Sequence, residues 1–133
     1  MPNSSNPFAI ADAIALAVHD YPLPVARIYI ALGVSLSRVP GIVVNAGSHG
    51  FISQELRGYR NGDWCFSLVL NKRWIRLYIR APELSRGVLL SGQFQCEFPS
   101  SEITAKGEIA LNISSEDLAK LVCDWMERLP QQT

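Results

Sequence analysis

The sequence has no excess of charge of either sign, because 12 basic and 12 acidic residues give a formal net charge of zero at pH 7. Dedicated nucleic-acid-binding proteins usually carry a basic excess. The charges are unevenly spread, however: residues 57–86 hold seven basic and two acidic residues, whereas residues 87–133 hold three basic and seven acidic ones. We expect the two segments to complement each other within one fold or across a dimer. The alternative is a basic patch for an anionic partner.

Cysteine and histidine are scarce and widely spaced. The three cysteines show no C-x-x-C or other metal-ligand spacing, and the two histidines are far apart: Cys65, Cys96, Cys123, His19 and His49. This pattern argues against a disulfide framework and a zinc site, and it predicts reduced thiols in a cytoplasmic protein. We therefore expect no metal and no cofactor.

Long apolar runs are also missing. The most apolar segment, residues 28–36, is too short to span a bilayer, and the N-terminal residues lack the features of a signal peptide. A chain of 133 residues with 48% apolar residues is long enough to bury a core. We expect a soluble, cytoplasmic protein that folds as a single domain over residues 1–133 and has no contact with membranes.

Helix signals occur near both ends of the chain. Asn6 and Pro7 suit the start of a helix that ends before Pro22. Near the C-terminus, Ser114 and Asp117 resemble a capping box at the start of a second helix. The apolar residues of this second helix recur at helical spacing: Leu118, Leu121, Val122, Trp125, Met126 and Leu129. This stripe predicts that the C-terminal helix packs against a sheet.

Residues 24–33 fit two structures. Pro24 at the start and Gly33 at the end favour a short helix, whereas the β-branched and aromatic content suits a strand. We favour the helix. Strands are indicated at residues 42–47 and 51–59.

The clearest element is a β-hairpin over residues 64–80, which follows a tight turn at residues 61–63. Its first strand alternates Trp64 and Phe66 against Cys65, which would place Cys65 on the more exposed side. Further strands are indicated within residues 87–98 and 106–113. Runs of strands between terminal helices predict an α+β protein, with a mainly antiparallel sheet and the N-terminal and C-terminal helices packed on one face.

The second strand of the hairpin has an unusual polar side. Its residues 73, 75, 77 and 79 alternate with an aromatic and cationic set: Trp74, Arg76, Tyr78 and Arg80. Such a set occurs on ordinary solvated sheet faces. It is also typical of binding hot spots, so we interpret it as a candidate partner-binding surface. The basic residues of this stretch are a candidate anion-binding set: Arg73, Arg76 and Arg80.

No local pattern names a catalytic chemistry. His49 lies in a loop between glycines without an orienting partner nearby in the sequence, and Cys65 and Asp63 could join it only in space. We therefore favour a small non-enzymatic module that binds a protein partner or itself, as regulators, chaperones and immunity proteins do, and that forms a homodimer. The alternatives are an enzyme with a site assembled around His49, and a binder of nucleic acid or of an anionic ligand.

Overall fold

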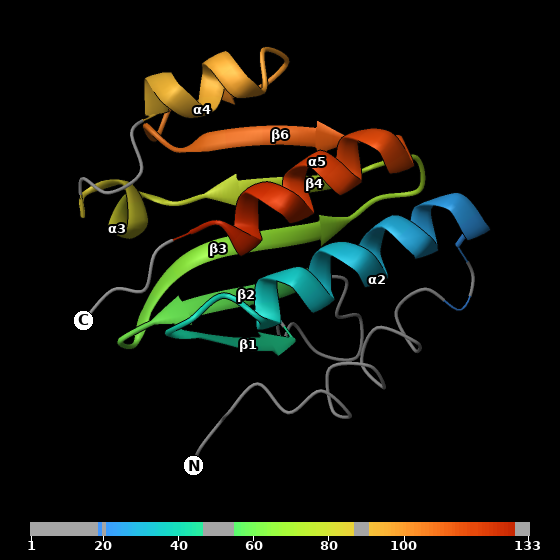
Figure 1. Cartoon of the computed structure of the whole chain (residues 1–133), viewed down its shortest axis with the longest axis horizontal. Coiled ribbons are helices and arrows are strands. Elements are labelled where there is room, and N and C mark those ends of the chain that lie inside the picture. The colour runs from blue at the N-terminus through green and yellow to red at the C-terminus, as the bar shows by residue number, and fades with distance from the viewer. Residues whose placement is uncertain (1–18, 20, 47–54, 87–90, 130–133) are drawn as a thin grey trace.

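The computed structural model describes residues 19, 21–46, 55–86 and 91–129. Its centre is a six-stranded sheet in which neighbouring strands run antiparallel, in the order β1-β2-β3-β4-β6-β5 (Figure 1). The strands are β1 (Ile42–Ala46), β2 (Glu55–Arg60), β3 (Asp63–Leu70), β4 (Ile75–Ile79), β5 (Glu102–Ile103) and β6 (Ile109–Ile113). The helices are α2 (Leu23–Ser37), α3 (Ala81–Leu84), α4 (Ser91–Glu97) and α5 (Glu116–Glu127).

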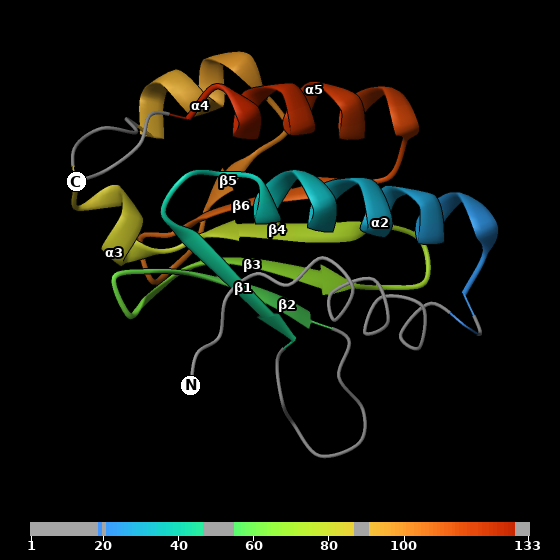
Figure 2. The same cartoon turned by 60° about the horizontal axis from the view of Figure 1, so that its bottom comes forward.

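Helices α2 and α5 lie side by side on one face of the sheet (Figures 1 and 2). The Ser35 hydroxyl donates to Glu127 at 2.9 Å, and the Cys123 thiol donates to the Ala31 carbonyl at 3.5 Å. Both pairs are 92 residues apart in sequence, so the two helices run parallel and in step. The α+β class, the antiparallel sheet and the helices on one face are confirmed. The helix expected over residues 6–20 lies almost wholly outside the described residues.

The sheet face beneath these helices is the core. Ile75, Leu77 and Ile79 are at most 1% exposed, as their alternation with polar residues predicted. Helix α2 confirms the helical interpretation of residues 24–33, but it continues through Gly33 to Ser37. Gly33 therefore does not end the helix.

The hairpin turns are formed as expected. Asn61 and Gly62 both have positive φ, 54° and 85°, which is the geometry of the tight turns that the right-handed strand twist favours. The second turn is closed by a hydrogen bond from the Asn71 amide to the Trp74 carbonyl at 3.0 Å. Two antiparallel strands can be joined by a short turn, so the whole hairpin lies in one continuous stretch. This explains why the sequence alone indicates the hairpin over residues 64–80.

Strict alternation was wrong at the start of β3. Gly58 pairs with Phe66 and Tyr59 pairs with Trp64, so the register shifts by one residue and Cys65 is the extra residue of a bulge. Cys65 and Phe66 are consequently both buried. Trp64, by contrast, shares the opposite face with Ser67.

Residues 91–97 form helix α4, so the strand expected there is wrong over this part; residues 87–90 lie outside the described part of the chain. Phe94 and Phe98 are four residues apart, and their rings contact Trp125 of α5 at centroid distances of 4.9 and 6.4 Å. The Phe98 amide donates to the Phe94 carbonyl at 2.8 Å, a helical i→i−4 bond that brings both rings to one side of the turn.

Helix α5 begins one residue later than expected. The Ser115 side chain, not that of Ser114, accepts a hydrogen bond from the Leu118 amide at 3.1 Å. Leu121, which was assigned to the buried stripe, is 55% exposed, and Ala119 is buried in its place. Within the described ranges, none of the helices has the length and apolar character that a membrane crossing requires.

Candidate functional site

The face of the sheet opposite α2 and α5 carries no helix among the described residues (Figure 2). A hollow of about 440 Å³ lies on this face. It is lined by residues of β2, β3 and β4 and of the β5–β6 connection: Glu55, Trp64, Ser67, Arg76, Tyr78, Arg80, Thr104, Ala105, Lys106 and Glu108. We call these residues the open-face site.

The indole of Trp64 is held between two guanidinium groups. The Cζ atoms of Arg57 and Arg80 lie 3.8 and 3.9 Å from the ring centroid. The indole Nε1 donates to the Phe66 carbonyl at 3.0 Å and to the Ser67 hydroxyl at 2.9 Å. Because the β3 bulge turns Trp64 to this face, the bulge creates the arrangement.

Arg80 is fixed by three contacts. Besides the indole, it donates to the Trp64 carbonyl at 3.1 Å and lies 3.3 Å from the Glu108 carboxylate. Glu108 precedes β6 and is only 12% exposed. The guanidinium therefore has a defined position before any ligand arrives.

Arg76 is fixed in a similar way. Its guanidinium donates to the Tyr78 hydroxyl and to the Asn112 side chain, both at 2.8 Å, and lies 3.4 Å from Glu102. Antiparallel pairing of β4 with β6 brings Arg76 opposite Asn112. Arg76 of β4 and Arg80, the residue after β4, thus both line the hollow, and each contacts a residue in or directly before β6.

The β5–β6 connection forms one wall of the hollow. The Thr104 hydroxyl accepts from the Lys106 and Glu108 amides at 3.3 and 3.2 Å, and Gly107 has a φ of +78°, which favours glycine. Among the described residues, the Lys106 ammonium group has no ion-pair partner. It is therefore available to an incoming acidic group.

The structure brings together three of the four residues that the sequence selected for partner binding. Arg76, Tyr78 and Arg80 line the hollow, whereas Trp74 lies in the turn before β4 and does not. Arg73 is exposed in the same turn, so the three candidate anion-binding arginines are not gathered at one point. Their roles remain predictions.

The sequence patterns did not indicate Trp64, Ser67 or Lys106 as residues of the site. Strict alternation put Trp64 with Phe66, and only the bulge separates the two. Glu108 was visible in the pattern of residues 106–113, since it alternates against Ile109, but nothing in the sequence showed that β6 pairs with β4.

The ion pairs of this face join the basic middle segment to the acidic C-terminal segment. Arg80 meets Glu108 and Arg76 meets Glu102. These pairs agree with the expectation that the two segments complement each other within the fold.

Of the residues considered for catalysis, the described ones, Cys65 and Asp63, do not line the hollow. His49 lies outside the described residues. Cys65 was expected on the more exposed side but is fully buried, and burial together with the neighbouring Glu83 carboxylate raises the pKa of its thiol. Asp63 lies at the β2–β3 turn, 3.9 Å from Arg86. In the described part of the chain, no cluster of three or more His, Cys, Asp or Glu residues is placed to hold a metal ion.

No family model, curated protein or solved structure matches this chain. We therefore infer the function from the geometry of the open-face site.

Proposed function

We propose that this protein is a non-enzymatic binding module that holds a segment of a protein partner in the open-face site. The observation that carries the proposal is the stacking of Arg57, Trp64 and Arg80 beside a hollow of about 440 Å³. A half-buried indole between two guanidiniums offers an apolar edge with hydrogen-bond donors beside it. Tryptophan, tyrosine and arginine are the residue types most enriched in binding hot spots.

The site is ordered before binding, which favours affinity. Arg76 and Arg80 each make three contacts with side chains or carbonyl groups of the sheet. Immobilising a long side chain at an interface costs about 0.5–1.5 kcal/mol, and here most of that entropy is already lost in the free protein. A partner therefore gains the contacts without ordering the arginines.

The mixed charge of the site supports a polypeptide ligand. Lys106, Arg76 and Arg80 supply donors, while Glu55 and Glu108 supply acceptors. A polypeptide segment offers both kinds of group through its backbone and can add an acidic side chain for Lys106. Aromatic rings on the partner would contact Tyr78 and the exposed edge of the Trp64 indole.

The alternative of a nucleic-acid or anionic ligand has less support. Arg80 and Arg76 already face Glu108 and Glu102, so part of their charge is neutralised within the fold. Binding of a polyanion depends on cations that can replace counterions along its phosphates. The alternative nonetheless makes a distinct prediction of steep salt dependence.

The proposal is tested by selecting peptides from a displayed random library against the wild-type protein and measuring their affinities for two variants. Arg80→Gln removes the stacked guanidinium. Arg128→Gln is the matched control, because Arg128 is an exposed arginine that also makes one ion pair, with Glu97 at 2.6 Å, away from the open-face site. Circular dichroism is used to check that both variants fold.

We expect the selected peptides to bind Arg128→Gln like the wild type and to bind Arg80→Gln at least ~10-fold more weakly, the loss typical of a hot spot. Equal binding to both variants contradicts the proposal, as does the absence of any enriched peptide. Single-stranded oligonucleotides tested in parallel should not bind. If they bind with an affinity that falls steeply with salt, the nucleic-acid alternative replaces the proposal.

A further inference from the structure

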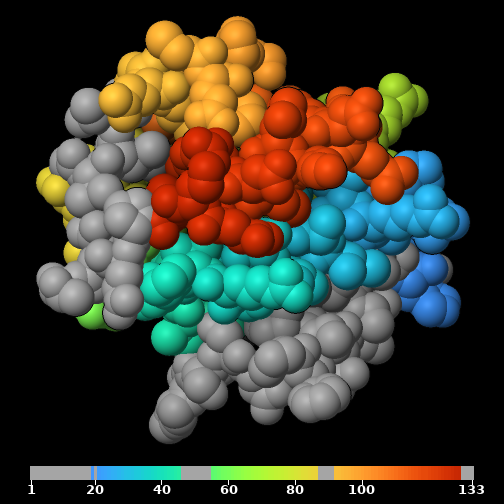
Figure 3. Space-filling view, in the orientation of Figure 1, coloured from blue at the N-terminus to red at the C-terminus, as the bar shows by residue number. Residues whose placement is uncertain are grey.

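Helices α2 and α5 carry most of the large apolar side chains that are exposed in the described part of the chain. The described residues include six exposed large apolar side chains. Four of them lie on α2 and α5, and the other two are Trp74 and Ile103. The four are Leu23, Ile30, Val34 and Leu121. Figure 3 shows the two helices side by side across the outer face of the helix layer. Leu23, Ile30 and Val34 are spaced by seven and four residues, so they share one side of α2, and such a row of exposed apolar side chains is a candidate interaction surface.

The charges on this face are separated between the two helices. The exposed charged residues of α2 and its C-cap are both basic, Arg27 and Arg38. Helix α5 exposes mainly acidic residues: Glu116, Asp117, Asp124 and Glu127, with Lys120 as the one basic residue before its C-cap. In the described residues, neither Arg27 nor Arg38 makes an ion pair, and neither do Asp117 and Asp124.

We propose that a second copy of this chain docks on this face, with α2 of each protomer packed on α5 of the other. A twofold axis that runs along the helices and between them produces this pairing, because it exchanges the positions of α2 and α5. Ile30 and Val34 of one protomer then meet Leu121 of its partner. Arg27 of one protomer then faces Asp117 of the other.

The charges select this arrangement over the other symmetric one. A twofold axis across the helices would stack α2 on α2 and α5 on α5, which places basic residues against basic residues and acidic against acidic. Like charges directly opposed across an interface disfavour it. The parallel and in-step packing of α2 and α5 keeps Arg27 near the height of Ala119, within reach of Asp117 on the facing helix.

The proposal is tested by sedimentation velocity of the full chain from about 1 to about 500 µM, a range that brackets the micromolar affinity expected of a small interface. We expect the wild type to dimerise. Ile30→Gln/Val34→Gln should raise the dissociation constant at least ~10-fold, because it removes apolar contacts while glutamine keeps helix propensity. Both positions are exposed, so circular dichroism should show an unchanged fold.

Two charge-reversed variants give a sharper result. Arg27→Glu alone and Asp117→Lys alone should each be monomeric, because like charges then meet at both symmetry-related contacts between residues 27 and 117. An equimolar mixture should form a heterodimer, since the reversed residue 27 of one variant faces the reversed residue 117 of the other. This rescue by mixing is not expected of a variant that merely unfolds.

Three results overturn the proposal. They are a wild type that stays monomeric throughout the range, a dimer that both charge-reversed variants retain, and a mixture that remains monomeric although both variants fold. Arg80→Gln separates this interface from the open-face site and should leave the dimer unchanged. Loss of the dimer in Arg80→Gln would move self-association to the other face of the sheet.

Discussion

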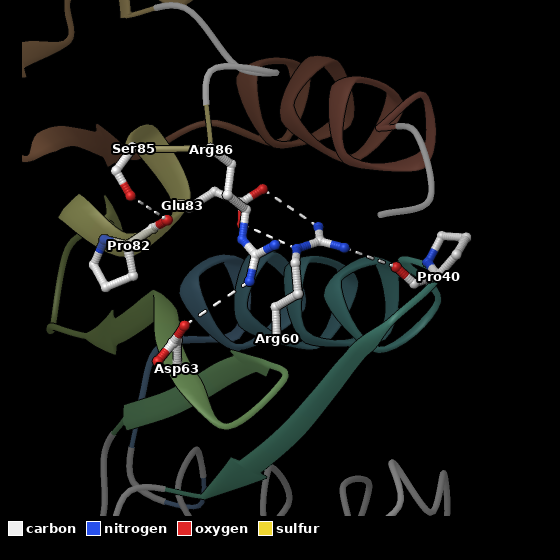
Figure 4. A network of polar contacts seen from close by, with 7 residues as sticks. All are labelled: Pro40, Arg60, Asp63, Pro82, Glu83, Ser85 and Arg86. Carbon is white, nitrogen blue, oxygen red and sulfur yellow. Dashed lines mark hydrogen bonds and ion pairs between the residues drawn. The ribbon is translucent and has the colours of Figure 1, made fainter. Parts of the chain in front are cut away.

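Arg60 at the end of β2 and Glu83 in α3 form a buried, two-pronged ion pair (Figure 4). Arg60 Nε and Nη2 donate to the two carboxylate oxygens of Glu83 at 3.0 and 3.3 Å, and the side chains are 1% and 4% exposed. Arg60 Nη1 also donates to the Pro40 carbonyl at 3.2 Å. Arg86 adds a second cation, 3.7 Å from Glu83. One pair thus joins β2, α3 and the turn that precedes β1.

Removing one partner of this pair should be costly. Arg60→Met leaves the Glu83 carboxylate buried with only the more distant Arg86, and we expect the free energy of unfolding to fall by about 3–5 kcal/mol. The double substitution Arg60→Met/Glu83→Met removes both charges and should be more stable than Arg60→Met alone. Guanidinium chloride unfolding measures all three proteins. A single variant within about 1 kcal/mol of the wild type would contradict the role given to the pair.

Much of the fold was predictable because its signals are local. The Asn61-Gly62 turn indicates the hairpin of β2 and β3, and the alternation of Ile75, Leu77 and Ile79 indicates strand β4, both without reference to the rest of the chain. The C-terminal helix is equally legible, since its apolar residues recur over three turns. Long, periodic elements of this kind carry their own evidence.

The rest depended on tertiary contacts that the sequence does not express. The bulge at Cys65 moves Trp64 to the open face, and no residue type in the segment "DWCF" indicates a bulge. Helix α4 is short. Phe94 in this helix and Phe98 directly after it can be recognised as core residues only from their contacts with Trp125. The hollow itself arises from the pairing of β4 with β6, two strands that are 29 residues apart from the end of one to the start of the next, counted as 109 − 79 − 1.

The N-cap of α5 offers a direct comparison between adjacent serines. Ser115 accepts from the Leu118 amide, so Ser115→Ala should lower the free energy of unfolding by about 1 kcal/mol. Ser114→Ala, one residue earlier, is the matched control and should change it by less than about 0.5 kcal/mol. Chemical denaturation checks both. An equal loss for the two variants would mean that the cap position is not Ser115.

The cysteines should react with a soluble thiol reagent in an order set by their burial. Cys96 is exposed on α4, Cys123 is half-buried, and Cys65 is fully buried. Burial raises the pKa of both Cys123 and Cys65, which further lowers their thiolate fraction at neutral pH. We expect one fast-reacting thiol in the folded protein, and Cys96→Ser should abolish it. A fast phase that survives in Cys96→Ser would show that another thiol is accessible.

Tyr29 of α2 should make the protein sensitive to alkali. Its burial and the Glu55 carboxylate raise the pKa of its phenol above the usual value. The folded state therefore keeps the proton where the unfolded state loses it. The stabilisation is complete below about pH 10 and is lost as the pH rises toward the folded-state pKa, by up to about 1.4 kcal/mol per pH unit. Tyr29→Phe should show a shallower decline between about pH 10 and 11 in urea unfolding. Identical slopes for both proteins would exclude Tyr29 as the cause.

The central claim is that the sheet face opposite α2 and α5 binds a protein partner, and amide chemical-shift mapping with a selected peptide tests it most directly. We predict that the largest shifts occur in β3, in β4 and in residues 104–108, together with a shift of the Trp64 indole N–H signal. Shifts confined to α2 and α5, with the Trp64 signal unchanged, would contradict the account.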